Sequence, residues 1–226
     1  GNPEDSASHR ATAKRYLDKL TDQVRRLKPV TVIPGASFVR FSHVENEFMN
    51  AGRVSVAEAA QRIEAAGSQP IALAPGEGWD GATSKDNRHS IEHYVSLMQS
   101  KDFKLHDHPS VPEAMIVESA AGFAARLKAQ NNVLLLQLLK VALGFFKPIT
   151  FFLTDSQVIV AVDPLKGAKI VPGQQNAFDV ALHSSALNQL LTQGWGLDTL
   201  VVSGRFRIPE GGLPRLHNSF NMATLN

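Results

Sequence analysis

Residues 149–182 read ITFFLTDSQVIVAVDPLKGAKIVPGQQNAFDVAL, and this stretch decides the fold. Its runs of β-branched and aromatic residues predict four short strands, at Ile149–Thr154, Gln157–Val162, Lys169–Val171 and Phe178–Leu182. The segments between these runs contain Asp, Ser, Pro and Gly, which are typical of turns. Because the connecting segments are short, we expect neighbouring strands to form antiparallel hairpins. The stretch therefore predicts a small antiparallel sheet.

Helical patterns precede this sheet. Apolar residues at helical spacing predict helices over Ala11–Leu27, between Ser55 and Gly67, around Ile91–Met98, from Ser110 to about Lys128, and over Val133–Leu143. Two of these segments begin with a serine that is followed three residues later by a glutamate, Ser55 with Glu58 and Ser110 with Glu113. This spacing predicts a capping box at the start of each helix.

The sequence after the sheet predicts one more helix and one more strand. Ser184 or Ser185 is a suitable N-cap for a helix that runs through Leu191. Thr199–Ile208 predicts a last strand, and the tail from Pro209 is expected to be irregular.

The N-terminal third alternates helices with two short apolar strands, at Val30–Ile33 and Ile71–Ala74. This order is typical of the end of a layered α/β domain. Glu77–Lys85 is rich in Gly and small polar residues, so we place a domain boundary there. We therefore predict an α+β chain in which the end of an α/β layer, residues 1–80, is followed by an antiparallel sheet with helices, residues 81–226.

Composition excludes several classes of function. Hydrophobic residues make up 43% of the 226 residues and charged residues 19%, which excludes a mostly disordered chain. The 23 basic and 21 acidic residues leave a net charge of +2, so charge gives no case for nucleic-acid binding. The absence of cysteine excludes disulfides, thiolate metal sites and cysteine nucleophiles. No apolar run reaches the roughly 18 residues of a membrane span, so we expect a soluble chain and favour the cytoplasm.

Two histidine motifs have the spacing of metal ligands. His89-Ser90-Ile91-Glu92-His93 fits H-x-x-E-H, in which two histidines four residues apart on a helix can share a metal. His106-Asp107-His108 is an H-x-H motif, but no D-H follows it. Neither motif has a visible third ligand. We expect exposed helix histidines in the first motif and loop histidines before a helix in the second, and we predict no metal ligands or cofactor in this chain.

The densest group of polar residues is at residues 37–50, SFVRFSHVENEFMN. It follows a predicted strand and a Pro-Gly turn, and it interleaves aromatic with polar side chains, which suits the wall of a polar ligand pocket. The candidate substrate-binding residues are Ser37, Arg40, His43, Glu45, Asn46 and Asn50. The alternative is a structural loop whose aromatic residues pack on the core while Asn46 and Asn50 form turns. The residues alone favour neither interpretation.

The N-terminal third also resembles a known family. KPVTVIPGASFVRFSHVENEFMN at Lys28–Asn50 and IALAPGEGW at Ile71–Trp79 resemble the C-terminal end of metallo-β-lactamase-fold proteins, in the branch that contains CMP-N-acetylneuraminic acid hydroxylase. Where many hydrolases of that superfamily carry a last metal-binding histidine, this chain has Pro34–Ser37 without one. The resemblance implies a metal-dependent hydrolase or oxygenase whose zinc or iron is bound in an intact parent protein.

The C-terminal part resembles a second family. The sequences of Pro148–Leu191 and Gly194–Ile208 are similar to the sterol-carrier-protein fold, in which helices and an antiparallel sheet surround an apolar tunnel. The candidate tunnel residues are Phe123, Leu143, Phe151, Leu153, Leu187 and Leu191. The alternative is an ordinary filled core.

Together these resemblances predict the C-terminal portion of a metal-dependent enzyme that is catalytically incomplete by itself, with a sterol-carrier-like accessory domain. The alternatives are a lipid or acyl-chain binding module without catalysis, or a dimerisation domain. The expected partners are the remainder of the metallo-β-lactamase domain, a lipid or acyl ligand, and a second copy of the chain. Nucleic acid is not expected among them.

Overall fold

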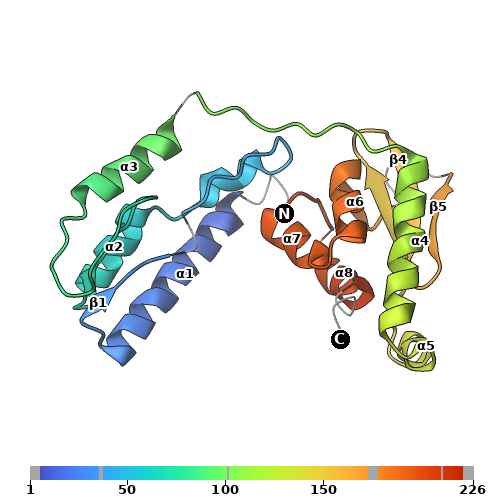
Figure 1. Ribbon diagram of the computed structural model, residues 1–226, viewed down its shortest axis with the longest axis horizontal. Helices are drawn as coiled ribbons and strands as arrows, with labels where there is room; N and C mark the ends of the chain where they lie inside the picture. The colour runs from blue at the N-terminus through green and yellow to red at the C-terminus, as the bar shows by residue number, and fades with distance from the viewer. Residues whose placement is uncertain (1–5, 36–37, 101, 173–177, 210, 221–226) are drawn as a thin grey trace. The chain divides into compact units, whose positions relative to one another are not determined.

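The computed structural model describes residues 6–35, 38–100, 102–172, 178–209 and 211–220, with side chains from residue 9 onward (Figure 1). These residues form a mixed α+β structure that divides into two compact units. The N-terminal unit contains Pro3–Ser42 and Glu47–Leu105. The C-terminal unit contains His43–Asn46 and the chain from His106 onward. In the described part of the chain, no helix is both long and apolar enough to cross a membrane.

The N-terminal unit combines helices with one pair of very short strands. Its elements are α1 (Ser6–Leu27), β1 (Thr31–Val32), the 3-10 helix η2 (Glu47–Gly52), α2 (Val56–Ala65), β2 (Gln69–Pro70) and α3 (Arg88–Gln99). The two strands pair in parallel, with Thr31 opposite Gln69. Strand β1 is shorter than the predicted Val30–Ile33, and β2 lies just before the predicted range Ile71–Ala74, which contains no strand. The apolar residues that follow β2, Ile71 and Ala72, are buried although they lie outside it.

Helix α2 begins as its sequence predicts. The Ser55 hydroxyl accepts a hydrogen bond from the Glu58 backbone N–H at 3.1 Å, and the Glu58 carboxylate accepts one from the Ser55 N–H at 2.9 Å. This confirms the first capping box. The second predicted box is wrong, because α4 (Glu113–Gln130) begins after Pro112 without a side-chain cap. Ser110 instead hydrogen-bonds to the side chain of Asp155.

The C-terminal unit is built on a four-stranded sheet in the order β5-β4-β3-β6. The strands are β3 (Ile149–Leu153), β4 (Val158–Asp163), β5 (Gly167–Val171) and β6 (Val180–Leu182). Pairing of β3 with β4 and of β4 with β5 is antiparallel, as predicted. Strand β6 instead joins β3 in parallel, with Val180 opposite Phe151. Strand β6 follows β5 in the sequence but lies beside β3 at the opposite edge of the sheet, so it does not pair with the strand that precedes it.

One face of this sheet forms the core of the unit. Side chains along β3 alternate, so Ile149, Phe151 and Leu153 are fully buried while Thr150 and Phe152 are partly exposed. The buried face belongs to one apolar core with residues of α4, α5 (Val133–Ala142), α6 (Ser184–Thr192), α7 (Gly196–Ser203) and α8 (Leu213–Phe220). Figure 1 shows α4 alongside the sheet and α5 at one end of α4.

Two predictions for the last third of the chain are wrong. The first half of the predicted strand Thr199–Ile208 is helical, because it belongs to α7, which ends at Ser203 and is followed by Gly204 with φ of +63°. A helix is favoured because Leu197 and Leu200 become buried on one side of it and Gly196 fits against the backbone of Leu190. The tail predicted to be irregular contains α8, whose Leu216 and Phe220 are buried in the core.

The predicted boundary segment Glu77–Lys85 lies inside the N-terminal unit. It is held by Glu77, whose carboxylate accepts hydrogen bonds from the Ala74 N–H at 2.8 Å, the Ser90 hydroxyl at 2.6 Å and the Lys85 ammonium at 3.1 Å. The division into a metallo-β-lactamase-like segment, residues 1–80, and a sterol-carrier-like domain, residues 81–226, stays a prediction.

Candidate functional site

The polar segment singled out from the sequence is shared between the two units. Arg40 and Asn50 belong to the N-terminal unit, and His43, Glu45 and Asn46 belong to the C-terminal unit. Ser37 lies outside the described residues. The candidate residues therefore fall into two groups, which are described separately.

The two asparagines bind backbone groups. Asn46 is buried; its side-chain oxygen accepts from the His43 N–H at 3.0 Å, and its amide donates to the Ser203 carbonyl at 2.7 Å. Asn50 makes a similar pair of hydrogen bonds, both of 2.9 Å, with the N–H and carbonyl of Phe41. This geometry matches the structural alternative for both asparagines, because their donors and acceptors already bind backbone groups.

Three histidines come together in the C-terminal unit and form what we call the histidine cluster, His43, His106 and His108. The ring of His43 stacks on that of His108 with centroids 4.8 Å apart, and the ring centroid of His106 lies 5.9 Å from that of His43. The Val44 N–H donates to the His106 carbonyl at 3.2 Å, which fixes one segment against the other. The H-x-H motif thus gains a third histidine from a distant part of the sequence.

Two buried nitrogens of this cluster lack hydrogen-bond partners within the described residues, Nδ1 of His43 and Nε2 of His108. Burial, together with the positive charges of Arg205 and His108, lowers the pKa of His43, while Glu45 acts in the opposite direction. His43 is therefore largely neutral at pH 7, and its unpartnered nitrogen can exchange a proton or a hydrogen bond with a ligand.

A buried ion pair lies next to the cluster. Arg205, only 5% exposed, donates from Nη2 to Glu45 Oε1 at 2.8 Å and to the Ser185 hydroxyl at 2.8 Å. Burial raises the pKa of Glu45, but the hydrogen bond and charge of Arg205 outweigh this effect and hold that pKa below its usual value. Glu45 Oε2 and Arg205 Nε have no hydrogen-bond partner among the residues described.

Ser185 leads from this ion pair to a third group of polar side chains. Its hydroxyl lies 2.9 Å from His183 Nδ1, and His183 Nε2 lies 3.6 Å from the carboxylate of Asp155. These residue types match a hydrolytic triad. However, His183 Nδ1 accepts from the Ser185 backbone N–H and caps α6, so its single lone pair is already used. Asp155 likewise accepts from the Ser184 N–H and hydroxyl. We assign these residues to capping.

Of the two candidate residues in the N-terminal unit, Asn50 lines a cavity of roughly 200 Å³, together with Arg53, Tyr94 and Met98. Arg53 donates to the Asn50 carbonyl at 3.2 Å. The guanidinium of Arg40 lies 4.0 Å from the ring centroid of Phe103. In the described part of the chain, neither arginine forms an ion pair with a carboxylate. Burial and the charge of Arg40 lower the pKa of Arg53.

The H-x-x-E-H motif presents no assembled site. His89, Glu92 and His93 are all exposed on α3. Across the whole described structure, no three His, Asp or Glu side chains are placed to hold a metal ion together. The described residues therefore do not fit a zinc or iron site by themselves.

Five of the six candidate tunnel residues lie in one apolar core, Phe123, Phe151, Leu153, Leu187 and Leu191. The ring of Phe220 lies 5.6 Å from that of Phe123 and 6.0 Å from that of Phe151, so α8 packs among them. The sixth candidate, Leu143, is exposed. Binding of an acyl chain by these residues stays a prediction.

Sequence reasoning missed Arg205 and the convergence of His43 with His106 and His108. Arg205 lies in a stretch predicted to be a strand, and its partner Glu45 comes from the other end of the sequence. A buried arginine has no local sequence signal. The H-x-H spacing was visible, but its contact with His43 depends on the tertiary fold.

A scan of family models and searches of curated proteins and of solved structures found no match to this chain.

Proposed function

We propose that this chain is the C-terminal portion of a metal-dependent hydrolase or oxygenase of the metallo-β-lactamase superfamily, and that His43 belongs to its substrate-binding site. The observation that carries the proposal is the histidine cluster, in which two buried ring nitrogens have no hydrogen-bond partner among the described residues. A buried polar atom left without a partner costs free energy, and a ligand that bound it would recover that cost.

The environment of His43 suits proton transfer. A neutral imidazole can accept a proton from water or from a substrate hydroxyl, and catalysis is most efficient when the pKa of the base lies near the working pH. The nearby positive charge of Arg205 disfavours protonation of His43, while Glu45 moderates that effect. Arg205 and Glu45 are positioning residues in this proposal, because they act through His43.

Zinc or iron would be bound by the part of the parent protein that precedes this chain, where it would polarise the substrate or activate water. The described residues do not form such a site, and we derive no step through the metal. The sterol-carrier-like accessory role of the C-terminal unit is part of the same proposal and rests on sequence resemblance.

The test uses a longer protein that includes the sequence preceding this chain, loaded with zinc or iron and assayed for hydrolysis of ester and phosphodiester substrates and for oxygen consumption. His43→Ala should lower kcat/KM at least ~10-fold, which corresponds to roughly 1.4 kcal/mol of barrier, with little change in melting temperature. The matched control is His89→Ala, because His89 is an exposed histidine on α3.

Two results would overturn the proposal. One is a longer protein without any metal-dependent turnover. The other is a His43→Ala variant that loses stability but keeps its specific activity, since that outcome would make the histidine cluster structural.

A further inference from the structure

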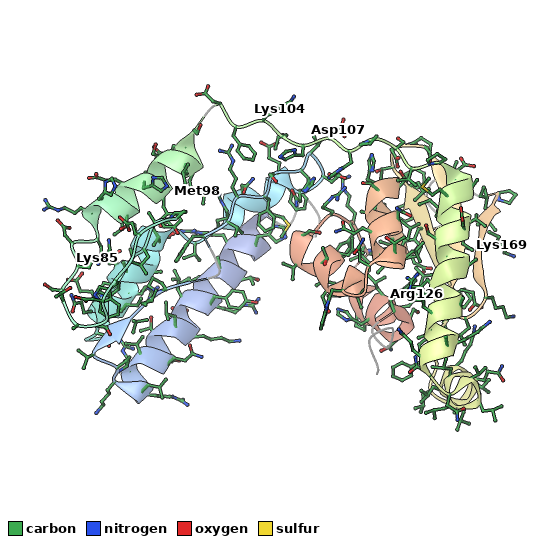
Figure 2. The ribbon with its side chains drawn as sticks, viewed as in Figure 1. Lys85, Met98, Lys104, Asp107, Arg126 and Lys169 are labelled. Atoms are coloured by element: carbon green, nitrogen blue, oxygen red, sulfur yellow. The ribbon has the colours of Figure 1, made fainter. Side chains whose placement is uncertain are left out.

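Helix α5 presents an apolar face that the described structure leaves uncovered. Leu134 is 77% exposed, Leu138 61% and Val141 86%, whereas Leu136 is buried in the core. The helix has its own N-cap, because the Asn132 side chain accepts hydrogen bonds from the N–H groups of the two leucines that follow Val133. Figure 2 shows side chains radiating from α5 at the end of α4, the helix that carries the labelled Arg126. A cluster of exposed apolar side chains of this kind marks a surface that contacts something other than water.

Apart from Asp163, which pairs with Lys140, the charged residues near this face are basic. The sequence contains no acidic residue from Ser119 to Thr154, whereas this stretch contains Arg126, Lys128, Lys140 and Lys147. Lys140 is neutralised, since it donates to the carboxylate of Asp163 at 2.8 and 2.9 Å. Lys128 and Lys147 are exposed, so a basic rim borders the apolar face.

A groove lies between the basic rim and the apolar face. It has a volume of about 350 Å³, and Lys128, Lys140 and Lys166 line it together with Val133 and Val141. Ammonium groups beside apolar side chains match the chemistry of an anionic phospholipid, in which phosphate oxygens lie next to glycerol and acyl carbons.

We propose that α5 and its basic rim dock the C-terminal unit onto the surface of an anionic phospholipid bilayer. The ten residues of α5 span about 15 Å, half of the ~30 Å hydrocarbon core, so the helix lies in the interface and does not cross it. Leu134, Leu138 and Val141 enter the acyl region. The lysines contact lipid phosphates.

Charge favours a bilayer over a second copy of the chain. A two-fold interface through α5 would place each basic rim close to that of the other copy, with like charges near one another. An anionic bilayer supplies the opposite charge over a wide surface. This proposal is independent of the enzymatic proposal, because it uses neither the histidine cluster nor a metal.

The test is co-sedimentation of the chain with phosphatidylcholine vesicles, with and without phosphatidylglycerol. We expect binding only to the anionic vesicles, with an affinity that falls as salt increases. The double variant Leu134→Gln/Leu138→Gln should bind at least ~10-fold more weakly, since both leucines are exposed and Gln keeps helix propensity high. The control is Val202→Gln, which replaces an apolar side chain on α7 that is 76% exposed. Circular dichroism establishes that each variant is folded.

A charge-reversal variant, Lys128→Glu/Lys166→Glu, should abolish the preference for anionic vesicles. Equal binding to both kinds of vesicle, or no binding to either, would overturn the proposal. Light scattering, which measures the oligomeric state, tests whether the face is instead an interface between copies. If the Leu134→Gln/Leu138→Gln variant converts a dimer to a monomer and the parent chain does not bind vesicles, the face is an interface between copies.

Discussion

The imidazole of His43 stacks on that of His108 with ring centroids 4.8 Å apart. The two residues lie in separate segments of the sequence, and the Val44–His106 backbone hydrogen bond holds those segments together. Because one nitrogen of each ring is buried without a partner in the described structure, the pair combines a fixed geometry with unused hydrogen-bonding capacity. This combination distinguishes the histidine cluster from the exposed histidines of α3.

The first prediction concerns the titration of His43. Its pKa in the folded chain should lie below 6.5, the value of an unperturbed histidine, as measured by NMR. His108→Gln should raise the pKa of His43, because it removes a neighbouring positive charge, whereas His89→Gln should leave it unchanged. The unfolded chain binds more protons than the folded chain between the lowered pKa and 6.5, so this group makes stability fall as pH decreases through that window. A pKa of His43 at or above 6.5 would contradict the assignment.

The second prediction concerns the buried ion pair of Glu45 and Arg205. Arg205→Met removes the cation and leaves a carboxylate with little access to water, which should cost about 3–5 kcal/mol of unfolding free energy. The double variant Glu45→Leu/Arg205→Met should recover part of that loss, because it leaves no unpaired charge. Chemical denaturation of the single and double variants measures this coupling. Strictly additive effects would mean that the two side chains do not stabilise one another.

The third prediction concerns Asn46. Asn46→Ala leaves the His43 N–H and the Ser203 carbonyl without their side-chain partner, which should destabilise the C-terminal unit by about 1–3 kcal/mol. The NMR signals of His43 should shift as well, because its backbone loses a constraint. Asn218→Ala, at an exposed position, should change stability by less than about 0.5 kcal/mol. Unchanged stability of Asn46→Ala would leave Asn46 available for a ligand.

Local signals in the sequence predicted the elements that depend on local interactions. The Ser55–Glu58 box and the α5 helix need only neighbouring residues, and both are present as predicted. Strands β3 and β4 were predictable because β-branched and aromatic residues are concentrated between residues with turn chemistry. The parallel partner of β3 was not predictable, because pairing with β6 depends on a crossover that no local pattern encodes.

The wrong secondary-structure prediction and the missed site residue have the same cause, because both depend on contacts between segments that are distant in the sequence. Helix α7 contains β-branched residues that favour a strand, but burial of Leu197 and Leu200 and the fit of Gly196 against α6 favour the helix. The sequence selects only some of the residues that lie around the histidine cluster. His43 and Glu45 were selected from their residue types, while Arg205 could be found only through contacts between distant segments.

The last prediction concerns Glu77 and the segment Glu77–Lys85. Hydrogen bonds from the Ser90 hydroxyl and the Ala74 N–H, together with Lys85, lower the pKa of Glu77 to about 2. Because this pKa lies below the usual glutamate value of 4.5, the ionised group stabilises the folded state fully above pH 4.5, and that stabilisation is lost as pH falls toward 2.

Glu77→Gln should therefore lower the melting temperature of the chain near neutral pH, and the difference from the parent chain should shrink as the pH is lowered toward 2. The same variant should make Glu77–Lys85 more sensitive to limited proteolysis at pH 7, because the carboxylate no longer joins Ala74, Lys85 and Ser90. Asp102→Asn, which changes an exposed carboxylate of the same unit, is the matched control. If the effect of Glu77→Gln on melting temperature is the same at pH 7 as at pH 2, ionisation of Glu77 does not stabilise this segment.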